Sequence, residues 1–379
     1  MTHQAYSEHR QRTGLVAHER YFWHDPGNGI GFSGPTTFVQ PDRHPESPDT
    51  KRRFLALLDV SGLTSQLERI EPRAATRAEL QYFHTTRYID EVARISAAGG
   101  GEIGDSLTIG AGSYEIAQLS AGGCIAAIDA VVAGRVRNAY ALVRPPGHHA
   151  DADGGRGFCV FGNAVIAIRH AQRVHGIGRV AVVDWDVHHG NGTETAFIDD
   201  PSVLTISVHQ DRCYPVDSGQ LDVVGTGDAR NTNLNIPLPP GSGHGAYVTA
   251  FERAVVPALL RFRPELIVIA SGLDASALDP LGRMMCTSRT YRELARQVLA
   301  AADSTAGGRV VATHEGGYSN GYVPFCGLAV VETFADIRTE ANDPYLGELE
   351  CQAGHALEPH QSAAVDAAAA QAARVPTGG

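Results

Sequence analysis

The segment Asp184-Trp185-Asp186-Val187-His188 carries two carboxylates and an imidazole at alternate positions. In an extended chain alternate side chains point to the same side, so Asp184, Asp186 and His188 share one face. Oxygen and nitrogen ligands of this kind suit a metal ion, and Asp274, which follows another strand-like segment, could add a further ligand. Ligation by Asp186, His188 and Asp274 would leave a coordination position open, as catalytic zinc requires. The competing interpretation is that these groups only form hydrogen bonds with loop backbone.

His148 and His149 are adjacent and follow two prolines in the segment RPPGHH. Neutral imidazoles beside a metal-bound water act as general bases and acids, and each needs a partner that orients its ring. The sequence offers Asp184 for one ring and Asn191 for the other. Because one partner is charged and the other is neutral, the two pKa values would move apart and give the histidines two roles.

Tyr318 follows two glycines, Gly316 and Gly317, so the backbone can approach a site closely and the phenol can project into it. A tyrosine hydroxyl can donate a hydrogen bond to an oxyanion that develops on a carbonyl carbon. By itself the residue is explained equally well as a core tyrosine in a glycine-rich turn.

Two further patterns resemble known motifs in their letters. The GxGxxG pattern at residues 29–34 follows no strand and runs into Pro35, so we reject it as a dinucleotide site. The GxSxG pattern at residues 317–321 does follow a strand, and Ser319 stays a candidate esterase nucleophile. Pro324 falls where the supporting helix should be established, which argues against that reading.

The elements that must position these residues are short β-branched runs alternating with helical patterns. We expect strands at residues 139–143, 179–183, 203–208, 265–271 and 309–314, and helices at 113–133, 162–175, 243–262 and 288–306. This alternation predicts an α/β fold, with a mainly parallel central sheet and helices on both faces. Four of the strands run directly into the polar segments described above. Ligands bind beyond the carboxyl ends of such strands, so these segments should converge at one edge of the sheet.

The alternation continues to about residue 335 without a linker, so the 379 residues predict one domain. We place this domain at residues 14–361, between a flexible N-terminal extension of residues 1–13 and an alanine-rich tail of residues 362–379. Residues 209–241 are rich in Gly, Pro, Asp and Asn and are expected to form a long functional loop.

Composition excludes several classes of protein. The chain has 31 Lys and Arg against 42 Asp and Glu, a net charge of −11, whereas a nucleic-acid-binding surface needs a basic face. We find no apolar run that approaches the ~18 residues of a membrane span and no apolar core of a signal peptide. The six cysteines form no CxxC pair. We therefore expect a cytoplasmic protein with reduced cysteines that binds neither nucleic acid nor membrane.

Five segments together resemble the zinc-dependent histone deacetylase superfamily, in particular its class II branch and the bacterial histone deacetylase-like amidohydrolases. They are RPPGHHA (144–150), GFCVFGN (157–163), VVDWDVHHGNGT (182–193), SGLDASALDPLGRM (271–284) and EGGYS (315–319). The likeness spans roughly residues 14–345. It implies a single arginase/deacetylase-like domain with long active-site loops, one catalytic Zn²⁺, a structural K⁺, and hydrolysis of a linear amide C–N bond.

The resemblance also implies roles for individual residues. It implies zinc ligation by Asp186, His188 and Asp274, and catalysis by His148, His149 and Tyr318, with Asp184 and Asn191 as partners of the histidines. It implies potassium ligation by Asp184, Asp186, His188, Ser207 and Val208, partly through carbonyl oxygens. The implied substrate contacts are Gly157, Phe158 and Tyr214 in the acyl-lysine channel, Asp105 at its rim, and Leu281, where polyamine-preferring relatives carry glutamate.

The function that we expect is removal of an acetyl or related short acyl group from an N-acyl lysine-type substrate by metal-activated water. The alternatives are deacetylation of acylated polyamines or other small N-acyl amines, a non-catalytic ligand sensor on the same scaffold, and the serine esterase. The related arginase group binds two manganese ions, but Gly190 and Ser276 stand where it needs further ligands. The resemblance also implies a homo-oligomer, either a dimer or a tetramer.

Overall fold

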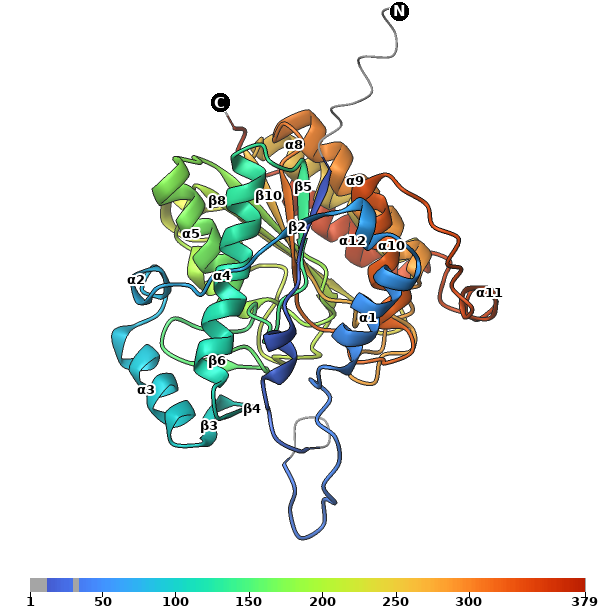
Figure 1. The fold of residues 1–379 in the computed structure, drawn as a ribbon. Helices are drawn as coiled ribbons and strands as arrows, with labels where there is room; N and C mark the ends of the chain where they lie inside the picture. The colour runs from blue at the N-terminus through green and yellow to red at the C-terminus, as the bar shows by residue number, and fades with distance from the viewer. Residues whose placement is uncertain (1–11, 30–33, 379) are drawn as a thin grey trace, which may run out of the picture.

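The computed structural model describes residues 12–29 and 34–378 and is built on a parallel sheet (Figure 1). Its eight strands follow the order β2-β1-β5-β11-β10-β7-β8-β9, and all neighbouring pairs are parallel. They are β1 (Thr13–Val16), β2 (Glu68–Ile70), β5 (Asn138–Ala141), β7 (Val180–Asp184), β8 (Val203–Gln210), β9 (Asn233–Leu238), β10 (Leu266–Ser271) and β11 (Val310–His314). A second sheet joins β4 (Leu107–Gly110), β3 (Gly100–Asp105) and β6 (Gly155–Arg156). The predicted fold class is confirmed.

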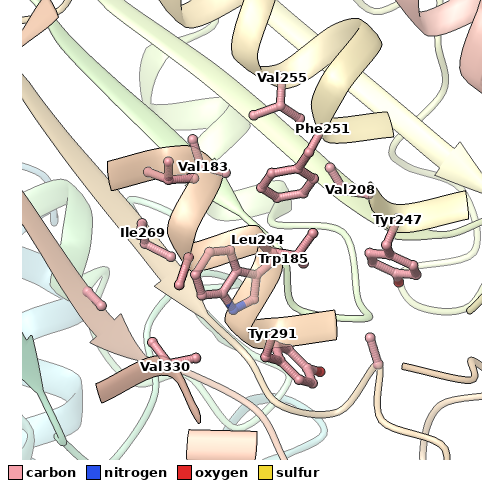
Figure 2. Close-up of a cluster of buried hydrophobic side chains, with 14 of the residues drawn as sticks. Val183, Trp185, Val208, Tyr247, Phe251, Val255, Ile269, Tyr291, Leu294 and Val330 are labelled. Atoms are coloured by element: carbon pink, nitrogen blue, oxygen red, sulfur yellow. The ribbon is translucent and has the colours of Figure 1, made fainter. Parts of the chain in front are cut away.

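The central strands are apolar at successive positions because both faces of the sheet are covered. In β7, Ala181 and Val183 belong to one hydrophobic core, whereas Val180 and Val182 belong to the other. Figure 2 shows the first core, in which the Trp185 ring lies 6.3 Å from that of Phe251. The sheet is therefore held rigidly from both sides up to the residues where its strands end.

Helices cover the sheet on both faces (Figure 1). One side carries α2 (Arg77–Leu80), α3 (Thr86–Ala97), α4 (Ser113–Val132), α5 (Asn163–His175) and α6 (Asn191–Phe197). The other side carries α1 (Asp49–Val60), α7 (His244–Ala250), α8 (Val256–Phe262), α9 (Ser288–Thr305), α10 (Val323–Ala335), α11 (Leu346–Leu349) and α12 (Pro359–Ala372). Short helical turns are η1 (Glu19–Trp23), η2 (Thr64–Gln66), η3 (Gly227–Ala229) and the π-helical η4 (Phe251–Val255).

Two predicted elements differ from the structure. The helix expected at 243–262 is divided into α7, the π-helical turn η4 and α8. The loop expected at 209–241 contains η3 and the edge strand β9. Asparagine is typical of loops, so the asparagines of this segment favoured a loop prediction. In the strand, the side-chain amides of Asn233 and Asn235 are satisfied because both donate to Glu194 Oε2, at 2.7 and 2.6 Å.

The two predicted domain boundaries fall at residues that belong to regular elements of the structure. Residues 1–11 of the expected flexible extension lie outside the described residues, and Thr13 already belongs to β1. The boundary at residue 361 falls inside α12, which begins at Pro359. The tail up to Ala372 is part of this helix, and its Val365 and Ala368 are buried in the core. In the rejected GxGxxG pattern, residues 30–33 also lie outside the described part of the chain.

Helix α4 corrects the expectation that no apolar run is long enough to span a membrane. It has 20 residues and passes that test by length and composition. Most of its apolar window is buried inside the protein, where it packs against α5 and β5. A Cβ atom at Gly122 would lie 1.8 Å from the carbonyl oxygen of Arg73, so its small residues allow close packing. Its apolar composition is explained by this burial.

Candidate active site

Strands β5, β11, β10 and β7 are consecutive in the sheet, so the polar segments that follow them lie side by side. His188 Nδ1 is 3.0 Å from Asp186 Oδ1 and 3.2 Å from Asp274 Oδ2. These three side chains come from the ends of β7 and β10 and are almost completely buried. Two carboxylates buried together are costly unless a cation is shared between them. The structure thus brings together the three predicted metal ligands.

The fit of this cluster to a metal ion can be judged from its surroundings. Asp274 Oδ2 receives no hydrogen bond from residues 12–29 or 34–378 and is free to ligate. The opposite oxygen, Oδ1, accepts from Val187 N at 2.8 Å, and Asp186 Oδ2 accepts from Gly316 N at 2.8 Å. Such outer hydrogen bonds orient metal ligands. The donor set, one imidazole and two carboxylates, fits zinc with an open position.

Two glycines make room for these carboxylates. A Cβ atom on Gly316 would lie 2.0 Å from Asp274 Oδ2, and one on Gly272 would lie 2.1 Å from Asp186 Oδ2. No side chain larger than hydrogen can occupy either position without moving a carboxylate. The cluster of Asp186, His188 and Asp274 therefore requires glycine at positions 272 and 316 for steric reasons.

The two adjacent histidines pack against each other beside this cluster, with ring centroids 4.0 Å apart and ring planes tilted by 42°. His148 Nδ1 lies 2.9 Å from Asp184 Oδ2, and His149 Nδ1 lies 2.8 Å from Asn191 Oδ1, which are the two predicted pairings. Burial alone would lower the pKa of His148, but the charges of Asp186 and Asp184 outweigh it and raise the pKa to about 10. The pKa of His149 is lowered well below 6.5, by burial and then by the charge of His148.

The neutral partner fixes the tautomer of His149. An amide oxygen can only accept a hydrogen bond, so Nδ1 of His149 must donate to Asn191 Oδ1. The amide is itself held in this orientation, because Asn191 Nδ2 donates to the His149 carbonyl at 3.2 Å. The lone pair of the neutral ring is therefore on Nε2, where it can accept a proton.

Tyr318 lies beside His188 of the cluster. Its ring centroid is 6.4 Å from that of His188 and 5.9 Å from that of Phe158. Burial raises the pKa of its hydroxyl well above 10, so the phenol stays protonated and can donate. The backbone N of Tyr318 donates to Asp279 Oδ2 at 2.8 Å, which fixes the turn that presents the ring.

Three of the predicted substrate contacts, Gly157, Phe158 and Tyr214, lie beside this cluster. The Tyr214 ring lies 5.0 Å from that of His149, and a Cβ on Gly157 would lie 2.5 Å from His149 Cδ2, so Gly157 narrows the approach. Phe158 is buried against Tyr318. At the rim, Asp105 Oδ2 accepts from Tyr214 Oη and Arg156 Nε, both at 3.2 Å.

Beside this approach is a polar groove of about 370 Å³. Two carboxylates, Glu102 and Asp105, line it together with His44 and Phe158. Leu281 lies on the loop after β10, where its backbone N donates to Asp279 Oδ1 at 2.9 Å and its carbonyl lies 3.8 Å from Cys213 Sγ. The groove is thus acidic, and Leu281, which does not line it, is held through its backbone.

Of the predicted potassium ligands, Asp184 and Ser207 are register partners on β7 and β8, and Val208 is the next residue of β8. Ser207 Oγ lies 2.9 Å from His209 Nδ1. Asp186 and His188 complete the predicted set and belong also to the ligand cluster. Asp184, Ser207 and Val208 thus lie on two adjacent strands, and Asp186 and His188 follow directly after the end of β7.

Sequence reasoning missed several residues that hold the site in place. Glu315 Oε2 accepts from the backbone N of Gly147 and of His148, at 2.7 and 3.1 Å, and so anchors the histidine turn. Glu315 and Asp279 both lie inside segments that carried the family resemblance, but spacing gave them no role. Their partners are backbone groups distant in sequence, which no local pattern reveals.

A buried ion network below Tyr318 was also missed. Glu46 binds Arg144 Nη2 at 2.9 Å and Lys51 Nζ at 3.1 Å, and Lys51 Nζ lies 5.7 Å from the centre of the Tyr318 ring. Arg144 also donates to the carbonyl of His24 at 2.6 Å. Residues 24–51 have no helical or strand periodicity, so the sequence gave no signal of this network.

The argument from Pro324 against a serine hydrolase is wrong. Helix α10 begins at Val323, and Pro324 lies in its first turn, where its missing N–H costs nothing. The observation that disfavours Ser319 as nucleophile is the buried carboxylate and histidine cluster, which a serine esterase would leave without a purpose.

Comparison with known proteins agrees with this geometry. The histone deacetylase domain profile matches residues 44–334. Over 345 residues the chain is 49% identical to a histone deacetylase-like amidohydrolase of Pseudomonas aeruginosa, with 90% of this chain and 91% of the relative covered. It is 35% identical over 370 residues to the human polyamine deacetylase HDAC10, with 93% and 51% covered. The crystal structure of the HDA15 HD domain matches with a TM-score of 0.79 at 31% identity, covering 96% of this chain and 95% of that one. This chain belongs to the histone deacetylase family.

Proposed function

We propose that the chain uses zinc held by Asp186, His188 and Asp274 to remove an acetyl or short acyl group from an N-acyl lysine side chain. The observation that carries this proposal is the juxtaposition at one buried cluster of a ligand set, a histidine with its lone pair on Nε2, and a protonated tyrosine. A bound zinc ion supplies Lewis-acid chemistry, because it lowers the pKa of a water molecule and polarises the substrate carbonyl.

The protein groups carry out the proton transfers. His149 accepts the proton of the attacking water at Nε2 and later donates it to the leaving amine, because its pKa is low and its Nδ1 is engaged by Asn191. His148 keeps its proton beside Asp184 and stabilises negative charge. Tyr318 donates to the carbonyl oxygen as charge develops on it.

The substrate class follows from the approach to the cluster. The rings of Phe158 and Tyr214 suit an extended aliphatic stem such as that of an acylated lysine. Glu102 and Asp105 at the rim favour a substrate whose remaining part is cationic. A basic peptide or protein that carries the acyl-lysine meets both conditions.

Acylated polyamines and other small N-acyl amines are the second candidate. They share the aliphatic stem and the positive charge, and human HDAC10, which is named a polyamine deacetylase, is a relative. Leu281 provides no carboxylate for a second amine, and so the peptide substrate is favoured. A ligand sensor is the least economical reading, since it would not need the histidine pair and Tyr318 together.

The finer assignments belong to the same proposal. We place a structural potassium ion at Asp184, Asp186, His188, Ser207 and Val208, in part through their carbonyl oxygens. We also propose that the protein is cytoplasmic, forms a dimer or tetramer, and binds neither nucleic acid nor membranes.

The test replaces Tyr318 with phenylalanine, which removes one hydroxyl and keeps the ring. With zinc content and folding intact, we expect hydrolysis of an acetyl-lysine peptide to fall by about 10²–10³-fold, the usual effect of losing one oxyanion donor. Tyr345→Phe, a half-exposed tyrosine on the surface, is the matched control. Near-normal turnover by Tyr318→Phe would refute the role, and mass-spectrometric hydrolysis of a panel of N-acyl amines would rank peptides against polyamines.

A further inference from the structure

A second cluster of metal-ligating side chains lies between helices α4 and α5. Asp129 Oδ1 on α4 is 2.8 Å from His170 Nε2 and 2.6 Å from His175 Nε2, both on α5. The three ligand atoms lie within 4.8 Å of one another, as do those of the Asp186 cluster. Two imidazole nitrogens therefore converge on one carboxylate oxygen.

His170 is supported from behind by a second carboxylate. Its Nδ1, which has no hydrogen-bond partner within the described part of the chain, lies 3.6 Å from Glu79 Oε1. Glu79 is itself fixed, since Arg73 donates to both of its oxygens, at 2.5 and 2.8 Å. A carboxylate near the outer nitrogen of an imidazole is the usual orienting partner of a metal-bound histidine, and Glu79 is placed to serve as one for His170.

The electrostatic position also favours a cation. His175 is the last residue of α5, and Asp129 lies in the last turn of α4. The carbonyl ends of both helices therefore direct partial negative charge toward the cluster. His170 lies between the carboxylates of Asp129 and Glu79, so a cation at its Nε2 would be attracted by both.

We infer that Asp129, His170 and His175 form a second metal site, which binds a transition metal such as Zn²⁺ and ties α4 to α5. Two imidazoles and one carboxylate suit zinc or its neighbours rather than Mg²⁺ or Ca²⁺. Tetrahedral ligation with bonds of 2.0–2.1 Å needs ligand atoms about 3.4 Å apart, so the cluster must open by less than about 1 Å. His175 and Asp129 are partly exposed and can make this adjustment.

This site is independent of the proposed catalytic function. Helix α5 leads into the first residue of β7, so its last turn lies at the edge where the strands begin, whereas the Asp186 cluster lies where they end. The readout is therefore metal binding, and activity serves only as a check of folding.

The experiment titrates Zn²⁺ by calorimetry into protein that already holds one equivalent and has been dialysed against metal-free buffer. We expect one further equivalent to bind, and His175→Ala to weaken it by at least the ~10–100-fold that an outer partner contributes. His360→Ala, which removes an exposed histidine on α12, is the matched control and should bind as the unchanged protein does. Asp129→Asn provides a second test on the other helix.

The alternative is a cluster occupied by protons alone. The proposal is overturned if no further equivalent binds, or if His175→Ala and Asp129→Asn both retain it, since the metal would then be elsewhere. If His175→Ala binds one equivalent of Zn²⁺ fewer and deacetylates at the unchanged rate, the proposal is supported. This result does not depend on which ion the Asp186 cluster binds.

Discussion

Replacing Gly316 with alanine should displace a metal ligand without removing any charged group. The new Cβ would lie 2.0 Å from Asp274 Oδ2, whereas ordinary contact begins at 3.4 Å, so this oxygen must retreat by about 1.4 Å. Metal–ligand distances hold within about 0.2 Å, so Asp274 could no longer ligate. The φ angle of Gly316 is outside the left-handed region, so the substitution adds no backbone strain.

We expect Gly316→Ala to bind zinc at least about 100-fold more weakly, because a lost ligand costs no less than the loss of an outer partner. Deacetylation should fall in proportion to zinc occupancy. The assay is zinc content after dialysis against a competing chelator, read beside hydrolysis of an acetyl-lysine peptide and thermal unfolding. Gly347→Ala, where a Cβ meets nothing within 4 Å, is the matched control. Full zinc content with normal turnover in Gly316→Ala would show that the cluster is not the metal site.

Three other changes test the surroundings of the site. Asn191→Asp places a negative charge beside His149 and should raise the lowered pKa of that imidazole. The acid side of the pH profile of kcat/KM should then move to higher pH. A profile that does not move would contradict the role of His149 as general base. Glu46→Gln leaves two buried cations unpaired and should cost about 3–5 kcal/mol in denaturant unfolding, against almost nothing for the exposed Glu71→Gln. Burial would raise the pKa of Glu46, but Arg144 and Lys51 lower it to about 2. The loss of unfolding free energy caused by Glu46→Gln should therefore be complete above pH 4.5 and become smaller as the pH falls toward 2. A chelator should abolish turnover while Ser319→Ala retains it, and the reverse pattern would establish the esterase.

The central fold could be predicted from the sequence because its strands are buried on both faces. A continuous apolar run such as residues 266–271 predicts a buried segment bounded by turns. Edge strand β9 gave no such signal, because its asparagines pair with Glu194 on a different element. The burial of Val365 in α12 likewise depends on a surface that is assembled only in the folded chain.

The predicted ligands and catalytic groups could be found because their chemistry is local. Alternation in a strand places Asp184 and Asp186 on one side, and a strand end brings them to the sheet edge. Two of the residues that hold the site have partners more than 90 positions away, namely Glu46 with Arg144 and Glu315 with Gly147. Spacing in one sequence contains no information on such pairs.

The small sheet of β4, β3 and β6 separates two properties of the enzyme. It carries Asp105 and Arg156 at the rim, whereas the metal-ligating cluster stands on β7 and β10 of the central sheet. The two sheets share no strand, and the rim is joined to the centre through contacts such as that of Tyr214 with Asp105. Substitutions at Asp105 and Arg156 are therefore expected to change which substrates are accepted while the metal-ligating residues keep their positions.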